Sequence, residues 1–345
     1  MSISDIWKQL VNMDGVITVV VNDGTRPSPA EQLSALHPAL AGRVRFLFAT
    51  GTHRPVTMEE RKKILGDLYA DDVTAESNVC DDGTHMYLGT TSRGTEVDVH
   101  RWLLEGPVLA VNTVEPHYFA GFSGGRKSFI PGASSRKTIV QNHFLACSLE
   151  AQPGRLEGNP VHEDLMEAAE FLAKRTEIVM VNGVYGIDSL FCGPYDTSFF
   201  QAAEVAALNC GVSVSERYAS LEVRPGNNLD VSLYQAMKAV FLWESVVVDG
   251  GELVLAAGCS EGLGAPQMER LLSASSASIA IPRSPAEYLL GDHAAIRLNR
   301  IRSRIRLSFR IGIDMQRFGF SVPPSGCEAV VENAGFSYPL YGSIK

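Results

Sequence analysis

The sequence predicts an α/β protein of two domains, each a mostly parallel β-sheet flanked by helices, with the active site in the cleft between them. Three observations support this fold class. Strand-length apolar runs alternate with longer helical runs, the strand-like runs are almost continuously apolar, and the chain has 345 residues. Continuously apolar strands are typical of sheets covered on both faces, and strand–helix alternation is typical of parallel sheets. This length favours about two domains.

Short apolar runs, rich in Val, Ile, Leu and Ala, are expected to form the strands. They cover residues 15–21, 44–50, 108–114, 177–184, 245–250, 252–258 and 277–282. Longer amphipathic or Ala- and Leu-rich runs are expected to form the helices. These cover residues 29–41, 58–72, 136–150, 160–175, 198–209, 231–243, 265–275 and 284–298. From about residue 299 the chain is basic, and we expect a helix or strand with a solvated basic face.

A polar stretch at residues 215–230 interrupts the alternation and contains Pro-Gly-Asn-Asn. Such a composition is typical of a junction, which we place near residues 205–228. The predicted domains are therefore residues 1–210, carrying the cofactor loop and the catalytic histidines, and residues 211–345, contributing contacts to a substrate carboxylate.

Composition excludes several classes of protein. Lys and Arg number 30 against 39 Asp and Glu, a net charge of −9, which argues against a nucleic-acid binder or a protein that binds anionic membranes. No apolar run is long enough for a membrane span, and the first residues do not resemble a signal peptide. The 6 cysteines are dispersed without a CxxC pair, which fits neither a disulfide scaffold nor a cysteine zinc site. We therefore expect a reduced, cytoplasmic protein.

Polar side chains follow three of the predicted strands. Asp23 and Arg26 follow the first strand, His53 follows the second, and His117 follows the strand at 108–114. Ligands in open parallel sheets bind beyond the carboxyl ends of the strands, so we expect these side chains to converge on one crevice. A proline in each turn stiffens the segment that carries them.

A glycine-rich, basic segment, GFSGGRKS, covers residues 121–128. Glycines let backbone N–H groups approach an anion, and the basic side chains neutralise it, so the segment is either a phosphate-binding loop or a flexible turn. It lacks the P-loop and G-x-G-x-x-G spacings. Lys127 is either a phosphate contact or a nucleophile.

Two helical runs carry further candidates. His143 could ligate a metal through a neutral imidazole, but its helix offers no second histidine, so any metal would need non-protein ligands. Tyr234, Gln235 and Lys238 share one helix face, where a phenol, an amide and an ammonium group would hold a carboxylate. A solvated helix face is the alternative.

Taken in order, the motifs NDGTRP, GTHRP, VEPHYFAGFSGGRKSFIPG, QNH and LYQAMK resemble the lactate racemase family. Enzymes of this family use a nickel-pincer nucleotide, pyridinium-3,5-bisthiocarboxylate mononucleotide. The resemblance runs from about residue 17 to about residue 265, and its central stretch is long and specific.

The resemblance implies a role for each matching residue. His53 and His117 would be the two acid/base residues, Lys127 would tether the nucleotide through a thioamide, and His143 would ligate nickel. A second set would hold the substrate carboxylate, with Tyr234 beside it on the helix: Arg26, Gln235 and Lys238. A third set would contact the nucleotide and its phosphate: Asp23, Thr25, Ser123, Gly124 and Gly125.

The implied reaction is racemisation or epimerisation of a 2-hydroxy acid by reversible hydride transfer, with proteins of cofactor synthesis as partners. Two bases on opposite sides explain why inversion needs two histidines. Arg126 and Cys80 depart from the family pattern, which leaves lactate-like and larger hydroxy acids open. The alternatives are a non-catalytic or degenerate cofactor-binding homologue, and a phosphate-binding hydrolase or NAD-type dehydrogenase.

Overall fold

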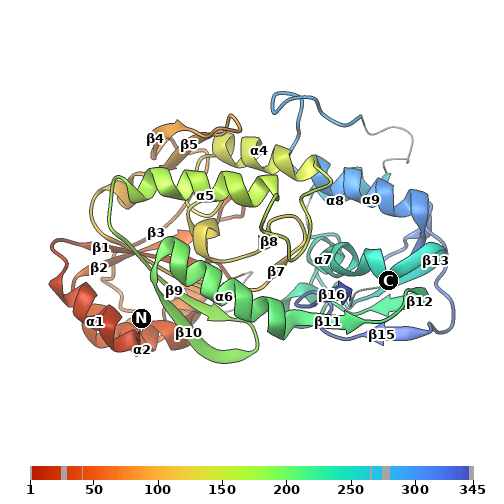
Figure 1. The fold of residues 1–345 in the computed structure, drawn as a ribbon, viewed down its shortest axis with the longest axis horizontal. Helices are drawn as coiled ribbons and strands as arrows, with labels where there is room; N and C mark the ends of the chain where they lie inside the picture. Colours follow the sequence, from red (N-terminus) through yellow and green to blue (C-terminus); the bar gives the residue numbers. More distant parts are fainter. Residues whose placement is uncertain (1, 25–28, 41, 265, 274–279, 342–345) are drawn as a thin grey trace. The chain divides into compact units, whose positions relative to one another are not determined.

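The computed structural model describes residues 2–24, 29–40, 42–264, 266–273 and 280–341 (Figure 1). It confirms a mixed α/β fold with mostly parallel sheets. The chain forms two compact units. Unit 1 comprises Met1–Glu115, Phe122–Asn142 and Leu156–Asn209, and unit 2 comprises Pro116–Gly121, His143–Arg155 and Cys210–Lys345. Two short segments from the N-terminal half thus belong to unit 2, which a single boundary after residue 210 does not anticipate.

Unit 1 is built on a six-stranded sheet in the order β10-β9-β6-β1-β2-β3. Every neighbouring pair is parallel except β9 and β10, which are antiparallel. Four of its strands coincide closely with strands expected from the sequence: β1, β2, β6 and β9. The bounds are β1 (Ile17–Asn22), β2 (Val44–Ala49), β3 (Ala75–Ser77), β6 (Val108–Val114), β9 (Ile178–Val184) and β10 (Ile187–Pro194).

Helices cover both faces of this sheet (Figure 1). One face packs on the first three helices, and strand residues that alternate along the chain, such as Val19 and Val21, enter that core. Its helical side is built from residues such as Leu10 and Leu33. Figure 1 shows α5 on the opposite side of the sheet from α1 and α2. The bounds are α1 (Ile3–Asn12), α2 (Ala30–Leu40), α3 (Met58–Leu65), α4 (Arg136–Phe144), α5 (Pro160–Ala173) and α6 (Tyr195–Cys210).

Local capping explains where two of these helices begin. Thr57 accepts from the backbone N–H of Glu60, whose carboxylate accepts from the backbone of Thr57 in return, so α3 starts with a capping box. The side chain of Asn159 accepts from two amides of the first turn of α5, and Pro160 follows it. The predicted helices 58–72 and 136–150 end earlier as α-helices, and each continues as a 3₁₀ turn.

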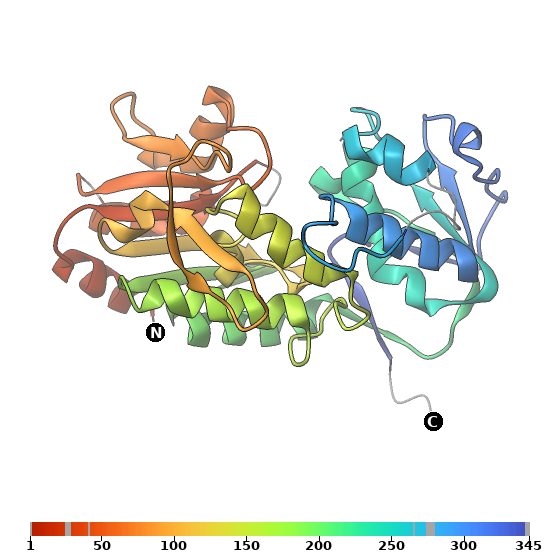
Figure 2. The same cartoon turned by 90° about the horizontal axis from the view of Figure 1, so that it is seen from above.

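A hairpin of β4 (His85–Thr90) and β5 (Glu96–His100) packs beside α5 (Figure 2). The hydroxyls of Thr91 and Thr95 donate to the fully buried carboxylate of Asp164 on α5. Asn142 of α4 donates to the same carboxylate at 2.8 Å. One buried acid therefore joins the hairpin to both helices.

Unit 2 contains a four-stranded, fully parallel sheet in the order β14-β13-β12-β15, and β11 pairs with β16 in a second parallel pair. The strand bounds are β11 (Gly211–Val214), β12 (Tyr218–Val223), β13 (Val247–Ala256), β14 (Arg306–Arg310), β15 (Ala329–Val331) and β16 (Tyr338–Tyr341). The helix bounds are α7 (Leu233–Trp243), α8 (Pro266–Ser273) and α9 (Asp292–Arg304). No helix in the described part of the chain is both long and apolar enough to cross a membrane.

Four segments of the C-terminal half differ in detail from what the sequence predicts. Residues 245–250 and 252–258 form one strand, β13, whose pairing with β12 shifts register around two adjacent glycines. The polar stretch 215–230 contains β12, which lies between two other strands of the sheet. The last residues of β12 are buried, although the sequence around them is polar. The helix expected at 284–298 begins at Asp292. The strand expected at 277–282 lies partly outside the described residues, and 280–282 are not in a strand.

Candidate active site

Asp23 and His53 meet at the carboxyl edge of the unit 1 sheet. β1 and β2 are parallel neighbours with Asn22 opposite Ala49, so the segments that follow them emerge side by side. His53 Nδ1 lies 2.6 Å from Asp23 Oδ2. The Asp23 side chain is buried, whereas that of His53 is 42% exposed. The pair brings together two of the predicted site residues.

The partner of His53 assigns its tautomer. A carboxylate only accepts hydrogen bonds, so the proton of the neutral ring lies on Nδ1 and the lone pair lies on Nε2. His53 therefore presents a proton-accepting atom on its far edge. The neighbouring candidates Thr25 and Arg26 lie outside the described residues.

His117 belongs to unit 2 and is held differently. It ends β7 (Pro116–His117), which pairs with β8 (Gly121–Phe122), and it is only 6% exposed. Its Nδ1 accepts long hydrogen bonds from the backbone N–H groups of Phe119 (3.5 Å) and Ala120 (3.3 Å). Because a backbone N–H only donates, this pattern puts the proton of the neutral ring on Nε2.

Aromatic rings fix the plane of His117. The ring of Tyr118 stacks on it with centroids 5.3 Å apart and an interplanar angle of 12°. The ring of Phe119 meets it edge-on at 4.4 Å and 85°. Such contacts restrict rotation of the imidazole, so Nε2 of His117 has a defined direction.

The glycine-rich loop is shaped by packing in unit 1. Gly124 and Gly125 have φ of +72° and +53°, a region that favours glycine. A Cβ on Gly124 would come within 2.6 Å of Asn112 Oδ1, and one on Gly125 within 2.4 Å of Phe199. The Gly125 N–H donates to Asn112 Oδ1, and the Ser123 N–H donates to the carbonyl of Glu115. The protein itself uses these two amides here, and the phosphate contacts of Ser123, Gly124 and Gly125 stay a prediction.

Arg126 points into the protein. It is fully buried, its guanidinium lies 4.1 Å from the Phe199 ring centroid, and Nη1 donates to the carbonyl of Phe122 at 3.0 Å. Burial lowers the pKa of Arg126 to about 9. The next residue, Lys127, is partly exposed within the 3₁₀ turn Gly125–Ser128. The departure from the family pattern at Arg126 therefore lies in the core.

His143 lies near the end of α4 and is the first residue of the second chain segment of unit 2, His143–Arg155. Its ring meets Phe119 edge-on at 5.1 Å. Among the described residues, no group of three or more His, Cys, Asp or Glu side chains could hold a metal ion. Within the described residues, His143 would therefore supply a single imidazole, and a metal bound there needs further donors from a non-protein group.

α7 carries the predicted carboxylate-binding residues. Its apolar side is buried, and Tyr234, Gln235 and Lys238 retain exposure on the other side. Tyr234 and Lys238 stand one turn apart, as the spacing predicts. The helix itself is confirmed; its contact with a substrate stays a prediction.

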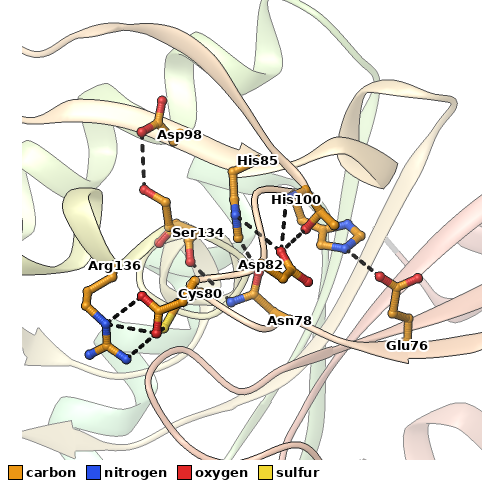
Figure 3. A network of polar contacts seen from close by, with 12 residues as sticks. Glu76, Asn78, Cys80, Asp82, His85, Asp98, His100, Ser134 and Arg136 are labelled. Carbon is orange, nitrogen blue, oxygen red and sulfur yellow. Dashed lines mark hydrogen bonds and ion pairs between the residues drawn. The ribbon is translucent and has the colours of Figure 1, made fainter.

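The segment around Cys80, the second departure from the family pattern, lies in a polar network of unit 1 (Figure 3). Asp81 forms an ion pair with Arg136 at 2.6 Å, and Asn78 Oδ1 lies 2.9 Å from His85 Nε2. Burial raises the pKa of the Cys80 thiol and lowers that of the His85 imidazole. Because the Cys80 thiol and the His85 imidazole both stay neutral, we assign this network a structural role.

Sequence reasoning missed one residue close to the predicted site. His293, on α9, has its ring centroid 5.8 Å from that of His143. It follows 150 positions after His143 in the chain and lies outside the motifs that resemble the family. A histidine inside an otherwise ordinary helical run gives no signal of its own.

Comparisons with known proteins agree with the resemblance of the motifs. Residues 3–154 match the family model described as the lactate racemase N-terminal domain. The lactate racemase of Thermoanaerobacterium thermosaccharolyticum is 31% identical over 267 residues, covering 72% of this chain and 61% of the relative. The lactate racemase of Lactiplantibacillus plantarum is 30% identical over 286 residues, covering 76% of this chain and 64% of the relative. The chain thus spans less than two thirds of the length of these curated relatives.

Solved structures show the same fold. The lactate racemase apoprotein from Thermoanaerobacterium thermosaccharolyticum superposes with a TM-score of 0.85 at 24% identity, covering 99% of this chain and 93% of that chain. A crystal structure of a protein from Thermotoga maritima gives a TM-score of 0.79 at 17% identity, with 99% of each chain covered. Both similarities extend beyond the matched N-terminal region into the C-terminal half.

Proposed function

The chain belongs to the lactate racemase family, and from this premise we propose that it is an isomerase that inverts the hydroxyl-bearing carbon of a 2-hydroxy acid. One observation gives the proposal its main structural support. His53 and His117 both contact the protein through Nδ1, and the proposal assigns the proton transfers to Nε2 of each ring. Inversion requires two such groups, one for each face of the substrate.

The proton transfers are assigned to these two atoms. For one enantiomer, Nε2 of neutral His53 accepts the hydroxyl proton, and Nε2 of protonated His117 returns a proton to the same oxygen on the other face. In this charge state His117 also carries a proton on Nδ1, which replaces its two long contacts with backbone N–H groups. For the opposite enantiomer the roles are exchanged. Asp23 orients His53 by accepting its Nδ1–H. This orienting role for Asp23 adds to its predicted contact with the nucleotide.

The donor groups of the chain fit a nickel-pincer nucleotide. His143 would offer one imidazole to the metal, and the organic group would supply the other donors. Lys127 supplies the amine for a covalent tether, and Thr25, Ser123, Gly124 and Gly125 would contact the nucleotide. When bound, this group supplies an electron-poor pyridinium ring that takes and returns a hydride.

The substrate carboxylate is assigned to Arg26, Gln235 and Lys238, with Tyr234 on the same helix face. Charge-assisted hydrogen bonds from a guanidinium and an ammonium group hold a carboxylate firmly. They do not bind the substituent on Cα, so the substrate class includes lactate and larger 2-hydroxy acids. Holding the carboxylate also retains the 2-keto acid between the two half-reactions.

The test uses the full chain produced together with the proteins that synthesise the cofactor. Intact mass and nickel content report loading and the tether at Lys127. Chiral chromatography of a panel of single-enantiomer 2-hydroxy acids reports inversion. We expect loaded wild-type protein to racemise at least one member of the panel. Loaded protein that inverts none of them would show a non-catalytic homologue instead.

A further inference from the structure

The segments that carry His117 and His143 lie in the N-terminal half of the sequence but belong to unit 2. α9, from the C-terminal half, contacts both of them. Arg297 donates to the carbonyl of Tyr118 at 2.8 Å, and Arg300 donates to the carbonyl of Cys147 at 3.0 Å. Cys147 ends the 3₁₀ turn that directly follows α4, where His143 lies. One helix therefore anchors the backbone next to His117 and the turn that follows the helix of His143.

His293 stands one turn before Arg297 on α9 and is buried among aromatic rings. Its Nε2 lies 3.0 Å from the hydroxyl of Tyr118, and its Nδ1 lies 2.5 Å from the hydroxyl of Tyr288. Tyr118 is thus held at both ends by α9, with Arg297 on its carbonyl and His293 on its hydroxyl. Its ring, fixed in this way, is the one that stacks on His117.

Two hydroxyls flank the His293 ring, so a neutral ring can donate to one and accept from the other. The N–H of Gly291 donates to the hydroxyl of Tyr288. Burial raises the pKa of Tyr288, so it keeps its proton, which it can donate to Nδ1 of His293. In that arrangement a neutral His293 carries its own proton on Nε2 and donates it to Tyr118. In either tautomer the ring bonds to both hydroxyls, which fixes the place of the Tyr118 hydroxyl.

Phe119 links the same residue to the other two histidines. Its ring makes edge-on contacts with three imidazoles, at 4.4 Å to His117, 5.1 Å to His143 and 4.9 Å to His293. The rings of His143 and His293 also meet edge-on at 5.8 Å. Movement of the His293 ring would therefore disturb both predicted site histidines, one through Tyr118 and both through Phe119.

We propose that His293 is a positioning residue of the active site, which holds His117 through Tyr118 and holds His143 through direct ring contact and Phe119. It touches neither substrate nor cofactor in this proposal. The proposal rests on the proposed function for its effect on catalysis, but the placement of His117 can be tested without that function.

The first experiment needs no cofactor. The full-length apoprotein is labelled with ¹⁵N only at its 8 histidines, and long-range ¹H–¹⁵N spectra report the tautomer of each ring. The signals of His117 and His143 are assigned with His117→Gln and His143→Gln. In wild type we expect His117 as the Nε2–H tautomer. In His293→Leu and Tyr118→Phe its two nitrogen signals should move towards each other, as for a ring exchanging between tautomers.

Matched variants separate positioning from general damage. Tyr118→Phe keeps the ring that stacks on His117 and removes only the hydroxyl that meets His293. Tyr288→Phe removes the other hydroxyl and should disturb His293 more than His117. His293→Gln offers an amide to Tyr118 and should restore much of the wild-type His117 spectrum. An unchanged His117 spectrum in both His293→Leu and Tyr118→Phe, with native thermal unfolding, would overturn the proposal.

The second experiment uses loaded protein. His293→Leu should lower kcat about tenfold or more while changing KM by about twofold or less, because it affects the orientation of a base and leaves carboxylate binding intact. The double variant with Tyr118→Phe should be no worse than the worse single variant. Additive losses would overturn the coupling through Tyr118. Inactive wild-type protein would count against the proposed function alone, since the apoprotein spectra remain decisive for His293.

Discussion

His53 and His117 present the same atom, Nε2, but the protein fixes them by different means. The His53 side chain is 42% exposed and is oriented by a hydrogen bond to one buried carboxylate, that of Asp23. His117 is buried, accepts two backbone N–H groups and packs between the rings of Tyr118 and Phe119. One histidine depends on a single polar side chain, the other on backbone geometry and aromatic packing.

The difference has consequences for the chemistry and for stability. The carboxylate leaves His53 with a lone pair on Nε2, whereas the backbone amides leave His117 with a proton there. Substitution near His53 should therefore alter activity with little effect on folding. Substitution near His117 should affect both, because the ring is part of the core of unit 2.

The largest expected effect comes from removing either imidazole. His53→Ala and His117→Ala should each lower racemisation by about 10²–10⁴-fold, while cofactor loading persists. Denaturant unfolding should separate them. His117→Ala should lose about 1–3 kcal/mol of stability, because it leaves a cavity among aromatic rings. His53→Ala should lose about 1 kcal/mol or less. Full activity in either variant would refute the two-base proposal.

The next effect tests how His53 is oriented. In Asp23→Asn, the side-chain NH₂ can face the imidazole, so Nδ1 becomes an acceptor and the proton moves to Nε2. We expect kcat to fall about 10²-fold, because the accepting atom is then blocked. Asp23→Ala imposes no tautomer and should lose less. Nickel content of each variant is the control for the predicted contact between Asp23 and the nucleotide. Equal kcat in wild type and Asp23→Asn would contradict this orientation.

An effect on stability and not on activity concerns a histidine of unit 1 with no predicted catalytic role. Burial, with a further contribution from Arg126, lowers the pKa of His162 to about 3. Below the unfolded-state pKa of about 6.5, the unfolded chain binds a proton at this position that the folded chain does not. Stability should therefore fall as pH drops from about 6.5 towards 3, by roughly 1.4 kcal/mol per pH unit from this residue.

His162→Asn is the matched control because it cannot take up this proton. Urea unfolding between pH 7 and pH 4 should show a pH slope reduced by about one proton in the variant. His85 and His100, whose pKa values burial also lowers, should maintain part of the slope. An unchanged slope would contradict the assignment. This titration identifies acid effects on folding, which can then be separated from pH effects on His53 and His117.

The smallest effect is expected on α7. Tyr234 is 40% exposed, and Tyr234→Phe removes one hydroxyl from the predicted carboxylate contacts, so KM should rise about threefold with kcat unchanged. Lys238→Met removes the charge and should raise KM by about tenfold. Steady-state kinetics of the loaded protein measure both. A change in kcat alone would place these side chains in a different role.

Local patterns predict much of unit 1. The apolar runs at 108–114 and 177–184 become β6 and β9 almost residue for residue, because a strand covered on both faces needs an unbroken apolar sequence. Prediction of strands from the sequence is less accurate where the apolar pattern is weak. The sequence does not predict β12, which lies in a polar stretch, and it predicts β13 as two strands because the two glycines of β13 resemble a turn.

The site shows the same division. The sequence predicts that Asp23 and His53 converge because each follows a strand of a parallel sheet, and the structure places His53 Nδ1 2.6 Å from Asp23 Oδ2. The anion-binding role of Gly124 and Gly125 stays a prediction, and the structure adds that both glycines pack closely against Asn112 and Phe199. A glycine in the sequence does not reveal whether the space it leaves receives a ligand or a neighbouring side chain.

The sequence by itself determined the α/β alternation, the polar residues after each strand and the motifs of the family, since all of these depend on neighbours within about twenty positions. The tertiary structure alone decided that residues 116–121 and 143–155 belong to unit 2 and that α9 holds them. Contacts such as that of Tyr118 with His293 join residues 175 positions apart. Packing selects such pairs through shape and hydrogen-bond geometry, which leave no periodic signal along the chain.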